Sequence, residues 1–521
     1  MLPIRRSALA SSLSAPLRNP LSRDAVSRTP LSLSLTQRRD ISVQQLDQQR
    51  NGRERVVILG SGWAGYTLSS DLNPKKYQVV VISPRSYFVF TPLLASTSVG
   101  TLEFRTALEP VRSRRNQAEF FQGWGDSVDL ERKTLQIEEA VEDPWQGRAL
   151  ASDRHGDETT GERKEEKKLQ AKKGELFDMS WDKLIVAVGC YSQTFGTKGV
   201  KENAYFLKDV GDARKIRNRL LSCFETANLP TTSEAMVKQL LNFAVVGGGP
   251  TGIEWSAELH DIIKEDMSKF YPHLVPHARI TVYDVAPTVL NMFDEKLANY
   301  AMDTFKREGI DIKTSHHVQE LREGVPEGAE HEVRDGQTCY TLHLKEEGQV
   351  GVGMCVWSTG LMMNPFVENA LEGKVDRHEK SGGIMTNDRL RALSPSGEAI
   401  EDVYAVGDCA ILQNTSYPAT AQVANQKATW LAKRLNKGDL EAKGFTYRDL
   451  GVMAYVGNWN SIVQSGGSDF SGRVAWLIWR GAYLAKSVSW RNRILIPVYW
   501  YILPLFYETN YAVCKRRLLI L

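Results

Sequence analysis

Two runs of branched apolar residues each end in a glycine-rich turn, and a helix-like pattern follows in both places. The first run covers residues 56–59 and the second covers residues 243–246. This order predicts a strand, a tight turn and a helix start, twice in one chain. Glycines in such a turn let the backbone approach a pyrophosphate, which the free N–H groups of the helix then bind. The glycines in question are Gly60, Gly62 and Gly65 in the first copy and Gly247, Gly249 and Gly252 in the second.

The remaining apolar pattern places further elements around the two turns. Strands are expected at residues 78–82, 184–188, 279–284, 354–357 and 403–408, with short alternating strands over residues 310–350. Helices are expected at residues 65–72, 209–228 and 418–436, and residues 83–94 form a proline-bounded aromatic loop. Strands that alternate with helices predict an α/β fold. We therefore predict two Rossmann-like nucleotide-binding domains, the layout of flavoproteins that hold two dinucleotides face to face.

The domain boundaries follow from this order of elements. The first nucleotide-binding domain takes residues 51–235 and, after an interruption, residues 355–440. The second domain occupies residues 236–354 between these two parts, and residues 441–521 form a C-terminal region. Residues 142–175 are rich in Lys, Glu, Gly and Asp, so we expect an exposed insertion there.

Charge and cysteine content exclude some functions. A net charge of +3 over 521 residues does not suit a strongly basic nucleic-acid binder, and no nucleic-acid-binding motif is present. The six cysteines form no CxxC or CxxxxC pair, and none lies between Gly65 and Cys190, where disulfide-using flavoreductases carry their reactive pair. The sequence also contains no EF-hand loop. Neither disulfide chemistry nor a metal site is therefore expected.

The first 50 residues have the composition of a mitochondrial transit peptide rather than of a folded element. They are rich in arginine and serine, and the acids before residue 41 are Asp24 and Asp40 alone. Arginine-rich, serine-rich and acid-poor segments of this kind direct proteins to mitochondria. A disordered basic tail is the alternative interpretation.

Two aspartates at strand ends are candidates for nucleotide contacts. Asp284 ends the second strand of the second domain, where a carboxylate accepts hydrogen bonds from ribose hydroxyls and repels a 2′-phosphate, which favours NADH over NADPH. The equivalent position in the first domain is Ser83, so Ser83 and Arg85 would contact that nucleotide differently. Asp408 follows a late apolar strand, as does the aspartate that holds FAD in flavoproteins of this layout. A solvated loop acid and a plain strand-ending turn are the alternatives.

Two polar clusters are candidates for the reaction itself. Glu254 lies in the helix start after the second glycine turn, where it either approaches the nicotinamide or only stabilises the helix dipole. Gln422, Asn425 and Gln426 fall within one helical turn after Pro418. Amides donate and accept hydrogen bonds without adding charge, so they suit the two neutral carbonyls of a quinone. Ordinary polarity at a helix start is the alternative.

The C-terminal region is basic and aromatic. Its last 49 residues contain eight Lys or Arg, one acid and four of the twelve tryptophans, but no uncharged apolar run long enough to span a membrane. On one continuous helix, Arg473, Arg480, Ser487 and Arg491 would fall within about 40° of one another, beside an apolar arc. Tryptophan and basic residues next to apolar surface suit a membrane interface. A core helix or a homodimer contact would show the same pattern.

Together these segments resemble the type II NADH:quinone oxidoreductases, the alternative NADH dehydrogenases of mitochondria. Besides the two glycine turns, the resemblance rests on the aromatic loop at residues 83–94 and on the Ala421-Gln422 pair. It extends over about residues 54–510, except for the charged insertion. The resemblance implies a non-covalently bound FAD, oxidation of NADH, reduction of ubiquinone and no proton pumping, on either face of the inner mitochondrial membrane.

The resemblance also implies roles for individual residues. FAD would be held by Gly60, Gly62, Gly65 and Asp408, and NADH by Gly247, Gly249, Gly252 and Asp284. Glu254 would lie where nicotinamide meets flavin, and Gln422 near the quinone head. The loop with Phe90 and Pro92 and the helix that begins at Pro418 are our candidates for the quinone entrance, from their apolar and amide content. Asn425 stands where the yeast-type pattern has histidine, so a histidine proton donor is not expected.

Other classes of protein remain as alternatives. A cell-death-type flavoprotein would bind NADH without rapid quinone reduction. A sulfide:quinone reductase would need reactive cysteines beside the flavin, and their spacing is absent here. A ferredoxin-type reductase would need a docking face for an acidic protein and would not explain the C-terminal tail. Members of the resembled family are often dimeric, which leaves a homodimer open.

Overall fold

The computed structural model describes residues 42–113, 117–140, 174–329 and 338–502. The chain divides into a first unit, Met1–Gln49, and a second unit, Arg50–Leu521. The described part of the first unit is a short helix, α1 (Val43–Gln48), which Ser42 caps. Most of the predicted transit peptide, almost all of the charged insertion and the end of the C-terminal tail lie outside the described residues.

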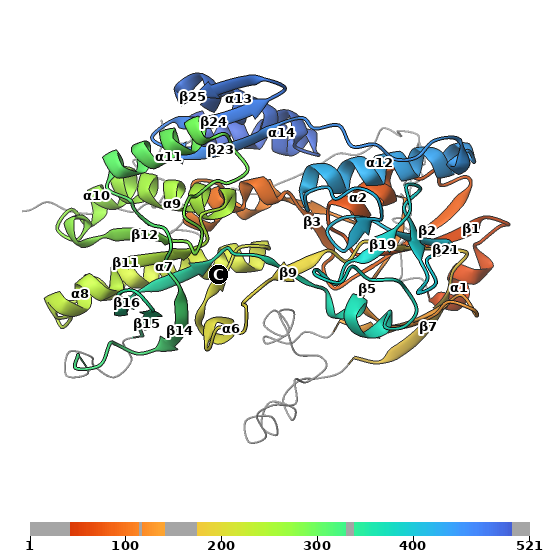
Figure 1. Cartoon of the computed structure of the whole chain (residues 1–521), viewed down its shortest axis with the longest axis horizontal. Helices are drawn as coiled ribbons and strands as arrows, with labels where there is room; N and C mark the ends of the chain where they lie inside the picture. Colours follow the sequence, from red (N-terminus) through yellow and green to blue (C-terminus); the bar gives the residue numbers. More distant parts are fainter. Residues whose placement is uncertain (1–41, 114–116, 141–173, 330–337, 503–521) are drawn as a thin grey trace, which may run out of the picture. The chain divides into compact units, whose positions relative to one another are not determined.

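A ten-stranded sheet forms the core of the first nucleotide-binding domain in the second unit (Figure 1). The centre of the sheet is parallel. Its strands lie in the order β21 (Ala399–Ala405), β8 (Lys183–Val186), β1 (Glu54–Leu59), β2 (Tyr77–Ser83) and β5 (Glu119–Asp129). Beyond β5, the sheet continues with β6 (Thr134–Glu139) and β7 (Leu176–Ser180). Beyond β21, it continues with β20 (Arg391–Leu393), β19 (Ile384–Thr386) and β22 (Ala410–Leu412). Val56, Val57 and Ile58 are fully buried, as expected of a parallel strand covered on both faces.

Two helices pack side by side on this domain. They are α2 (Trp63–Asp71), which follows the first glycine turn, and α12 (Ala421–Lys437), from the second part of the domain (Figure 1). The predicted helix at residues 418–436 is confirmed, with its start moved to Ala421 because Thr420 is the residue that caps it.

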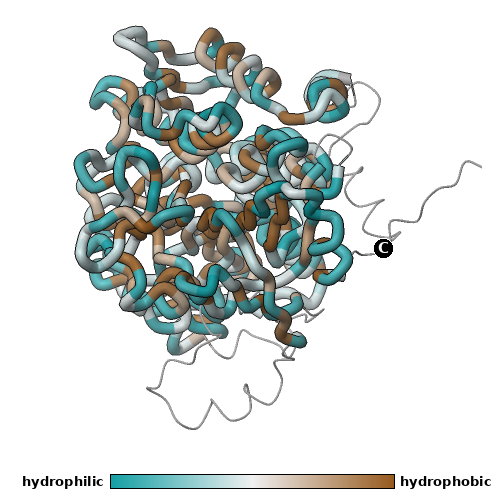
Figure 2. Tube along the Cα trace, turned by 90° about the vertical axis from the view of Figure 1, so that its right-hand side faces the viewer, coloured by the Kyte–Doolittle hydropathy of each residue, from teal (hydrophilic) through white to brown (hydrophobic). Residues whose placement is uncertain are grey.

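The second nucleotide-binding domain is built on a five-stranded parallel sheet. Its strands lie in the order β10 (Tyr205–Phe206), β17 (Met354–Trp357), β11 (Asn242–Val246), β12 (Arg279–Tyr283) and β13 (Asp311–Lys313). The predicted second domain ends at residue 354, which is the first residue of β17, so the rest of this strand lies beyond the predicted limit. The strand β10 also belongs to this sheet, although it lies in residues 51–235, the segment predicted for the first domain. Many of the hydrophobic stretches of the chain run through the middle of the molecule, and much of its outer edge is hydrophilic (Figure 2).

Helices and a small antiparallel sheet complete the second domain. The helices are α7, α8, α9 and α11: Val210–Ala227, Glu234–Leu240, Pro250–Ile262 and Glu295–Glu308. The short strands expected over residues 310–350 are confirmed as β13 and an antiparallel sheet of β14, β15 and β16: Val318–Glu323, Tyr340–Leu344 and Gly348–Val352. A two-stranded ladder of β9 (Cys190–Ser192) and β18 (Leu361–Met363) lies at the two crossings between the domains.

The aromatic segment at residues 83–94 is more structured than a loop. It contains the strand β3 (Tyr87–Val89), which pairs with β4 (Leu108–Pro110), and a 3₁₀ turn at Thr91–Leu93. A buried helix, α3 (Leu94–Val99), follows directly. Phe88 and Phe90 are buried against Trp63 of α2, which explains why this stretch is aromatic.

The C-terminal region contains a sheet that sequence patterning did not predict. An antiparallel sheet is formed by β23 (Val452–Gly457), β24 (Asn460–Ser465) and β25 (Ser468–Ser471). The helix α13 (Gly472–Lys486) follows directly. This sheet and α13 lie against α9 and α11 (Figure 1). Because these strands are short and mixed in polarity, they carry no strict alternation to read.

The prediction of one continuous helix through Ser487 and Arg491 is wrong. Helix α13 ends at Lys486, and Ser489 starts α14 (Trp490–Pro497) by accepting a hydrogen bond from the Asn492 N–H. The predicted basic stripe is therefore divided between two helices. No helix in the described part of the chain is long and apolar enough to cross a membrane.

The two glycine turns share one constraint, a close approach of backbone to backbone. A Cβ at Gly65 would lie 2.0 Å from the Gly60 carbonyl oxygen, and a Cβ at Gly252 would lie 2.0 Å from that of Gly247. Gly60 and Gly247 also have positive φ values of 110° and 114°. Both turns thus need glycine for the strand to reverse directly into the helix.

A pair of alanine variants tests this constraint. Gly65→Ala should lower the free energy of unfolding by about 1–3 kcal/mol, because the new methyl group meets a backbone oxygen that cannot move without shifting the turn. Gly62→Ala is the control, since a Cβ there meets no described atom within 4 Å. Urea unfolding of the cofactor-free proteins measures both. Equal stability of the two variants would contradict the argument.

Candidate cofactor site

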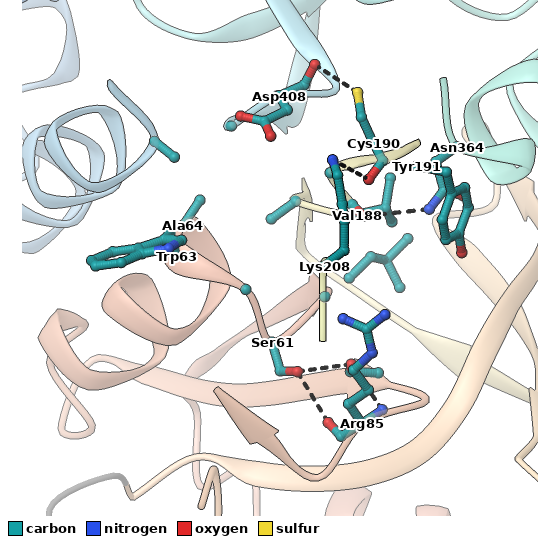
Figure 3. Close-up of a pocket in the computed structure, with 18 of the residues that line it drawn as sticks. Ser61, Trp63, Ala64, Arg85, Val188, Cys190, Tyr191, Lys208, Asn364 and Asp408 are labelled. Atoms are coloured by element: carbon teal, nitrogen blue, oxygen red, sulfur yellow. Dashed lines mark hydrogen bonds between the residues drawn. The ribbon is translucent and has the colours of Figure 1, made fainter. Parts of the chain in front are cut away.

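A cavity of about 450 Å³ lies beside the first glycine turn (Figure 3). Of the residues predicted to bind the first nucleotide, five line it: Gly60, Gly62, Ser83, Arg85 and Asp408. Gly65 does not line the cavity; it brings the start of α2 close to Gly60. The remaining wall comes from Trp63, the crossing at residues 187–191, Leu207 and Lys208, Asn364 and the start of α12.

The start of α2 forms an anion-binding end of this cavity. The helix begins after Gly62, and no side chain in the described part of the chain caps it, so its first N–H groups stay open. Ser61 Oγ lies 2.9 Å from Ser83 Oγ and 3.0 Å from the Arg85 and Tyr87 carbonyl oxygens, which fixes the turn against β2. The open room at Gly62, the free N–H groups and the helix dipole fit a pyrophosphate.

Arg85 places a permanent positive charge on the wall. Its guanidinium forms an ion pair with Asp209, which also accepts a hydrogen bond from the Tyr87 hydroxyl at 3.0 Å. Burial acts to lower the pKa of Arg85, but the neighbouring Asp209 carboxylate raises it overall. Asp408 stands across the cavity, and burial raises the pKa of its carboxyl despite two nearby lysines.

The second glycine turn approaches the same cavity. Thr251, in the first turn of α9, lines it, and no described side chain caps that helix start either. Asp284 accepts hydrogen bonds from the Gly248 N–H at 2.5 Å and the Ala286 N–H at 2.7 Å. The carboxylate therefore holds the turn in shape, at the strand end where the ribose of a dinucleotide is expected.

Glu254 lies one helical turn beyond Thr251 but is directed toward the C-terminal region. Its Oε1 accepts hydrogen bonds from the Tyr455 N–H at 3.1 Å and the Trp479 indole at 3.2 Å. Burial raises the pKa of Glu254 to about 8, more than these two donors lower it. The raised pKa favours the neutral, protonated form of this carboxyl near pH 7. It does not line the cavity directly, so its predicted contact with the two rings is not part of the described geometry.

A second buried acid lies next to Glu254 on α9. Glu258 accepts hydrogen bonds from Ser96 Oγ at 2.6 Å and Thr101 Oγ1 at 2.8 Å. Burial raises the pKa of Glu258 to about 7, with a smaller contribution from Asp261, and the charge of Glu258 in turn raises the pKa of Glu254. The two acids fill the seam between α9, α3 and the C-terminal region.

The amides at the start of α12 have partners other than those we predicted. Gln422 Oε1 accepts hydrogen bonds from the Tyr447 hydroxyl at 2.6 Å and the Leu450 N–H at 2.9 Å, and its Nε2 donates to the Gly451 carbonyl at 3.2 Å. Asn425 donates to Thr67 Oγ1 at 2.9 Å. The amides thus attach α12 to the segment 447–451 and to α2, while their neighbours Ala421 and Ala424 face the cavity.

The predicted quinone loop lies at the edge of the cavity. Thr91 lines it, and Phe90 packs between Trp63 at 5.3 Å and Tyr483 of α13 at 6.2 Å between ring centroids. Pro92 stands at the start of the 3₁₀ turn beside them. The loop therefore connects the cavity with the C-terminal region.

Cysteine chemistry has no support in the described part of the chain, whose five cysteines are all free. Cys190 lines the cavity, and its thiol donates to the Asp408 carbonyl at 3.2 Å. Burial raises the pKa of Cys190 far above its usual range, so it is a thiol and not a nucleophilic thiolate.

Among the cavity-lining residues that sequence reasoning missed are Trp63, Lys208 and Thr251. Trp63 and Thr251 lie inside the glycine motifs, so their position was a usable signal. Lys208 directly precedes Asp209, the cap of α7, and a single lysine before a helix carries no pattern.

The site residues fit FAD. The helix start and Arg85 suit its pyrophosphate, Asp408 can accept hydrogen bonds from hydroxyls, and the cavity is long enough to join both glycine turns. The comparisons with known proteins agree. A family model described as "Pyridine nucleotide-disulphide oxidoreductase" matches residues 54–428, and one described as "NDH2 C-terminal domain" matches residues 450–507.

Two curated relatives match almost the whole chain. A "Probable NADH dehydrogenase" from Dictyostelium discoideum is 37% identical, over 87% of this chain and 91% of its own. An "Internal alternative NAD(P)H-ubiquinone oxidoreductase A1, mitochondrial" from Solanum tuberosum is 34% identical, over 86% of each chain.

A solved structure shares the fold. NDH2 from Plasmodium falciparum, in complex with NADH, superposes with a TM-score of 0.71 at 22% identity, covering 86% of this chain and 99% of its own. The chain therefore belongs to the pyridine nucleotide-disulphide oxidoreductases, and within them to the type II NADH dehydrogenases that carry an NDH2 C-terminal domain.

Proposed function

We propose that the protein is an FAD-dependent NADH:quinone oxidoreductase that works at the surface of a mitochondrial membrane without pumping protons. The observation that carries the proposal is that both glycine turns meet one cavity, whose wall holds residues of the first turn and Thr251 of the second. Bound FAD would accept a hydride from NADH and pass two electrons to a quinone. The relatives named for NADH and ubiquinone support this choice of donor and acceptor.

The protein contributes binding and geometry to this reaction. The start of α2 and Arg85 would bind the FAD pyrophosphate, and Asp408 the hydroxyls near it. The start of α9 would bind NADH, with Asp284 at the strand end favouring a ribose without a 2′-phosphate. Two dinucleotides bound at these ends would meet with their rings in the shared cavity.

A quinone would enter between the aromatic loop and the C-terminal region. Phe90 and Tyr483 pack against each other where this passage would open, and Pro92 would lie beside it next to Thr91, which lines the cavity. Gln422 and Asn425 would shape the passage by holding α12 against its neighbours, and Gln422 keeps one Nε2 hydrogen for a quinone carbonyl.

Glu254 would supply a proton to the reduced quinone. Burial raises its pKa and so favours the protonated form at neutral pH, it lies one helical turn from the cavity, and its charge raises the pKa of Tyr483. A neutral acid in this position can donate a proton without a buried charge having to form first.

Membrane association would use the exposed side of α13. Val474 and Leu477 are each 60% exposed on one face of this helix, and Trp490 and Ile494 are exposed on α14. Apolar residues next to Arg473 and Lys486 suit the interface between lipid tails and headgroups. A quinone with a long tail would then reach the passage directly from the membrane.

Steady-state turnover tests the function. The purified protein with FAD should oxidise NADH with a short-chain ubiquinone at about 10 s⁻¹ or more. NADPH should be a much poorer donor, because Asp284 repels its 2′-phosphate. The rate at which absorbance at 340 nm falls, with NADH or NADPH and with or without quinone, measures both the turnover and the preference for NADH. NADH binding without rapid quinone reduction would instead favour the cell-death-type flavoprotein.

Unfolding at several pH values tests the protonation state of Glu254. A carboxyl whose pKa is raised from 4.5 to about 8 keeps its proton in the folded state and loses it in the unfolded state. Its contribution to stability is therefore present below pH 4.5 and is lost as the pH rises to 8, by about 1.4 kcal/mol per pH unit. Glu254→Gln mimics the neutral acid, so its stability relative to the wild type should increase between pH 6 and 8. A constant difference would contradict a raised pKa.

Charge substitutions on α13 test the membrane surface. Val474→Glu and Leu477→Glu together should release the protein from vesicles of anionic and neutral phospholipid, while NADH still reduces the bound FAD. Leu229→Glu is the control, because Leu229 is 50% exposed but lies in the turn after α7. Co-sedimentation with the vesicles measures binding. Unchanged sedimentation of the double variant would remove this face from the membrane contact.

A further inference from the structure

We propose that Lys208 is a cofactor-binding residue whose ammonium group contacts a negatively charged part of FAD. The inference rests on the proposed function only in that FAD occupies the cavity. Lys208 comes from the segment between β10 and α7, so a residue attached to the second domain's sheet would bind the cofactor of the first domain.

The backbone of Lys208 is held firmly in place. Its N–H donates to Asp212 Oδ2 at 3.1 Å, and the same carboxylate accepts from the Asp209 N–H at 3.1 Å. The bond from Asp209 is part of the capping box at the start of α7, and the bond from Lys208 attaches the preceding residue to the same carboxylate. The preceding residue, Leu207, is buried. The side chain therefore starts from a fixed point on the cavity wall.

The side chain of Lys208 extends through the cavity between Arg85 and Asp408 (Figure 3). Its Nζ donates to the Cys190 carbonyl at 3.4 Å, which is long for a hydrogen bond. An ammonium group has three donors, and the described residues offer this one no other hydrogen-bond acceptor. Two N–H groups are thus left for a molecule in the cavity.

The charges around Lys208 leave it without a direct counter-ion. Asp408 and Asp212 favour its charged form, and Arg85 opposes it. No carboxylate of the described residues lies within ion-pair distance of its Nζ, since Arg85 pairs with Asp209 and the Asp212 carboxylate caps α7. Burial accordingly lowers the pKa of Lys208. A bound anion would offset the free-energy cost of burying the charged ammonium group.

Lys427 provides a matched comparison. It is also buried close to Asp408, but it projects from α12 into a smaller neighbouring pocket and donates to the Ala410 carbonyl at 3.2 Å. The two lysines approach the same aspartate from different elements. Only Lys208 of the two lines the large cavity.

FAD carries negative charge in two places that would suit this ammonium group. The pyrophosphate is charged in both redox states, whereas the ring gains negative charge only when it is reduced. Loss of a contact to the pyrophosphate would weaken the binding of oxidised and reduced FAD equally. Loss of a contact to the ring would weaken the binding of reduced FAD more, and so shift the midpoint potential to a more negative value.

Reconstitution of cofactor-free protein with FAD, followed by flavin fluorescence, tests the proposal without any turnover. Lys208→Met should raise the Kd for FAD by about tenfold or more in at least one redox state, the usual effect of losing a charge-assisted hydrogen bond. Lys208→Arg should recover most of the affinity, because it keeps the charge. Lys427→Met should change the Kd by less than about threefold, because its amine bonds elsewhere.

The midpoint potential of each reconstituted variant decides between the two contacts. A weaker Kd with an unchanged potential assigns the pyrophosphate, and a more negative potential assigns the ring. Unchanged Kd and potential in Lys208→Met would overturn the proposal, as would equal losses in Lys208→Met and Lys427→Met. Should Lys208→Met not unfold cooperatively, Lys208→Gln replaces it. Because FAD binding is measured directly, a failure of quinone turnover would leave this result intact.

Discussion

The rest of the structure depends on one constraint, the close contact inside each glycine turn between the backbone at the start of the helix and the carbonyl group at the end of the strand. A helix can begin directly after a strand only if Gly65 lies against the Gly60 carbonyl, and Gly252 against that of Gly247. This contact brings the uncapped start of each helix to the end of its sheet, where a pyrophosphate can accept the open N–H groups. The position of both nucleotides is thus decided by backbone geometry before any side chain contributes.

Two such turns become a redox site only because the two domains are interleaved. The chain leaves the first sheet at β8, builds the second sheet, and returns through β17 to β21. The two crossings pair as β9 and β18, and they bring residues 187–191 and Asn364 to the wall of the cavity. Lys208 and Thr251 reach the wall from the second domain. The cavity therefore exists only in the assembled pair of domains.

The parts of the fold that sequence predicted are those with strong local patterns. Buried parallel strands such as β1 and β11 show continuous apolar runs, and the glycine turns follow from steric necessity. The C-terminal sheet was missed because its strands are short and partly exposed. The break at Ser487 was missed because the apolar spacing continues across it, while the capping by Ser489 ends the helix locally.

For the candidate site, the sequence could indicate which residues lie together but not where their side chains point. Gly60, Ser83, Arg85 and Asp408 come from separate segments, but each ends or follows a strand of one parallel sheet, so sequence could place them at one edge. The direction of a side chain depends instead on what packs against it. Gln422 is turned toward residues 447–451, which no local pattern indicates.

The C-terminal region determines the protonation chemistry of Glu254. On α9 alone, this carboxylate would lie near a helix start, where solvent and the helix dipole keep it ionised. Tyr455 of β23 and Trp479 of α13 cover it and exclude water, and two hydrogen bonds do not compensate for that loss of hydration. The same helix, α13, carries the exposed apolar face and Tyr483, which packs against Phe90. The raised pKa of Glu254 and the position of the exposed apolar face therefore both depend on how this single helix packs.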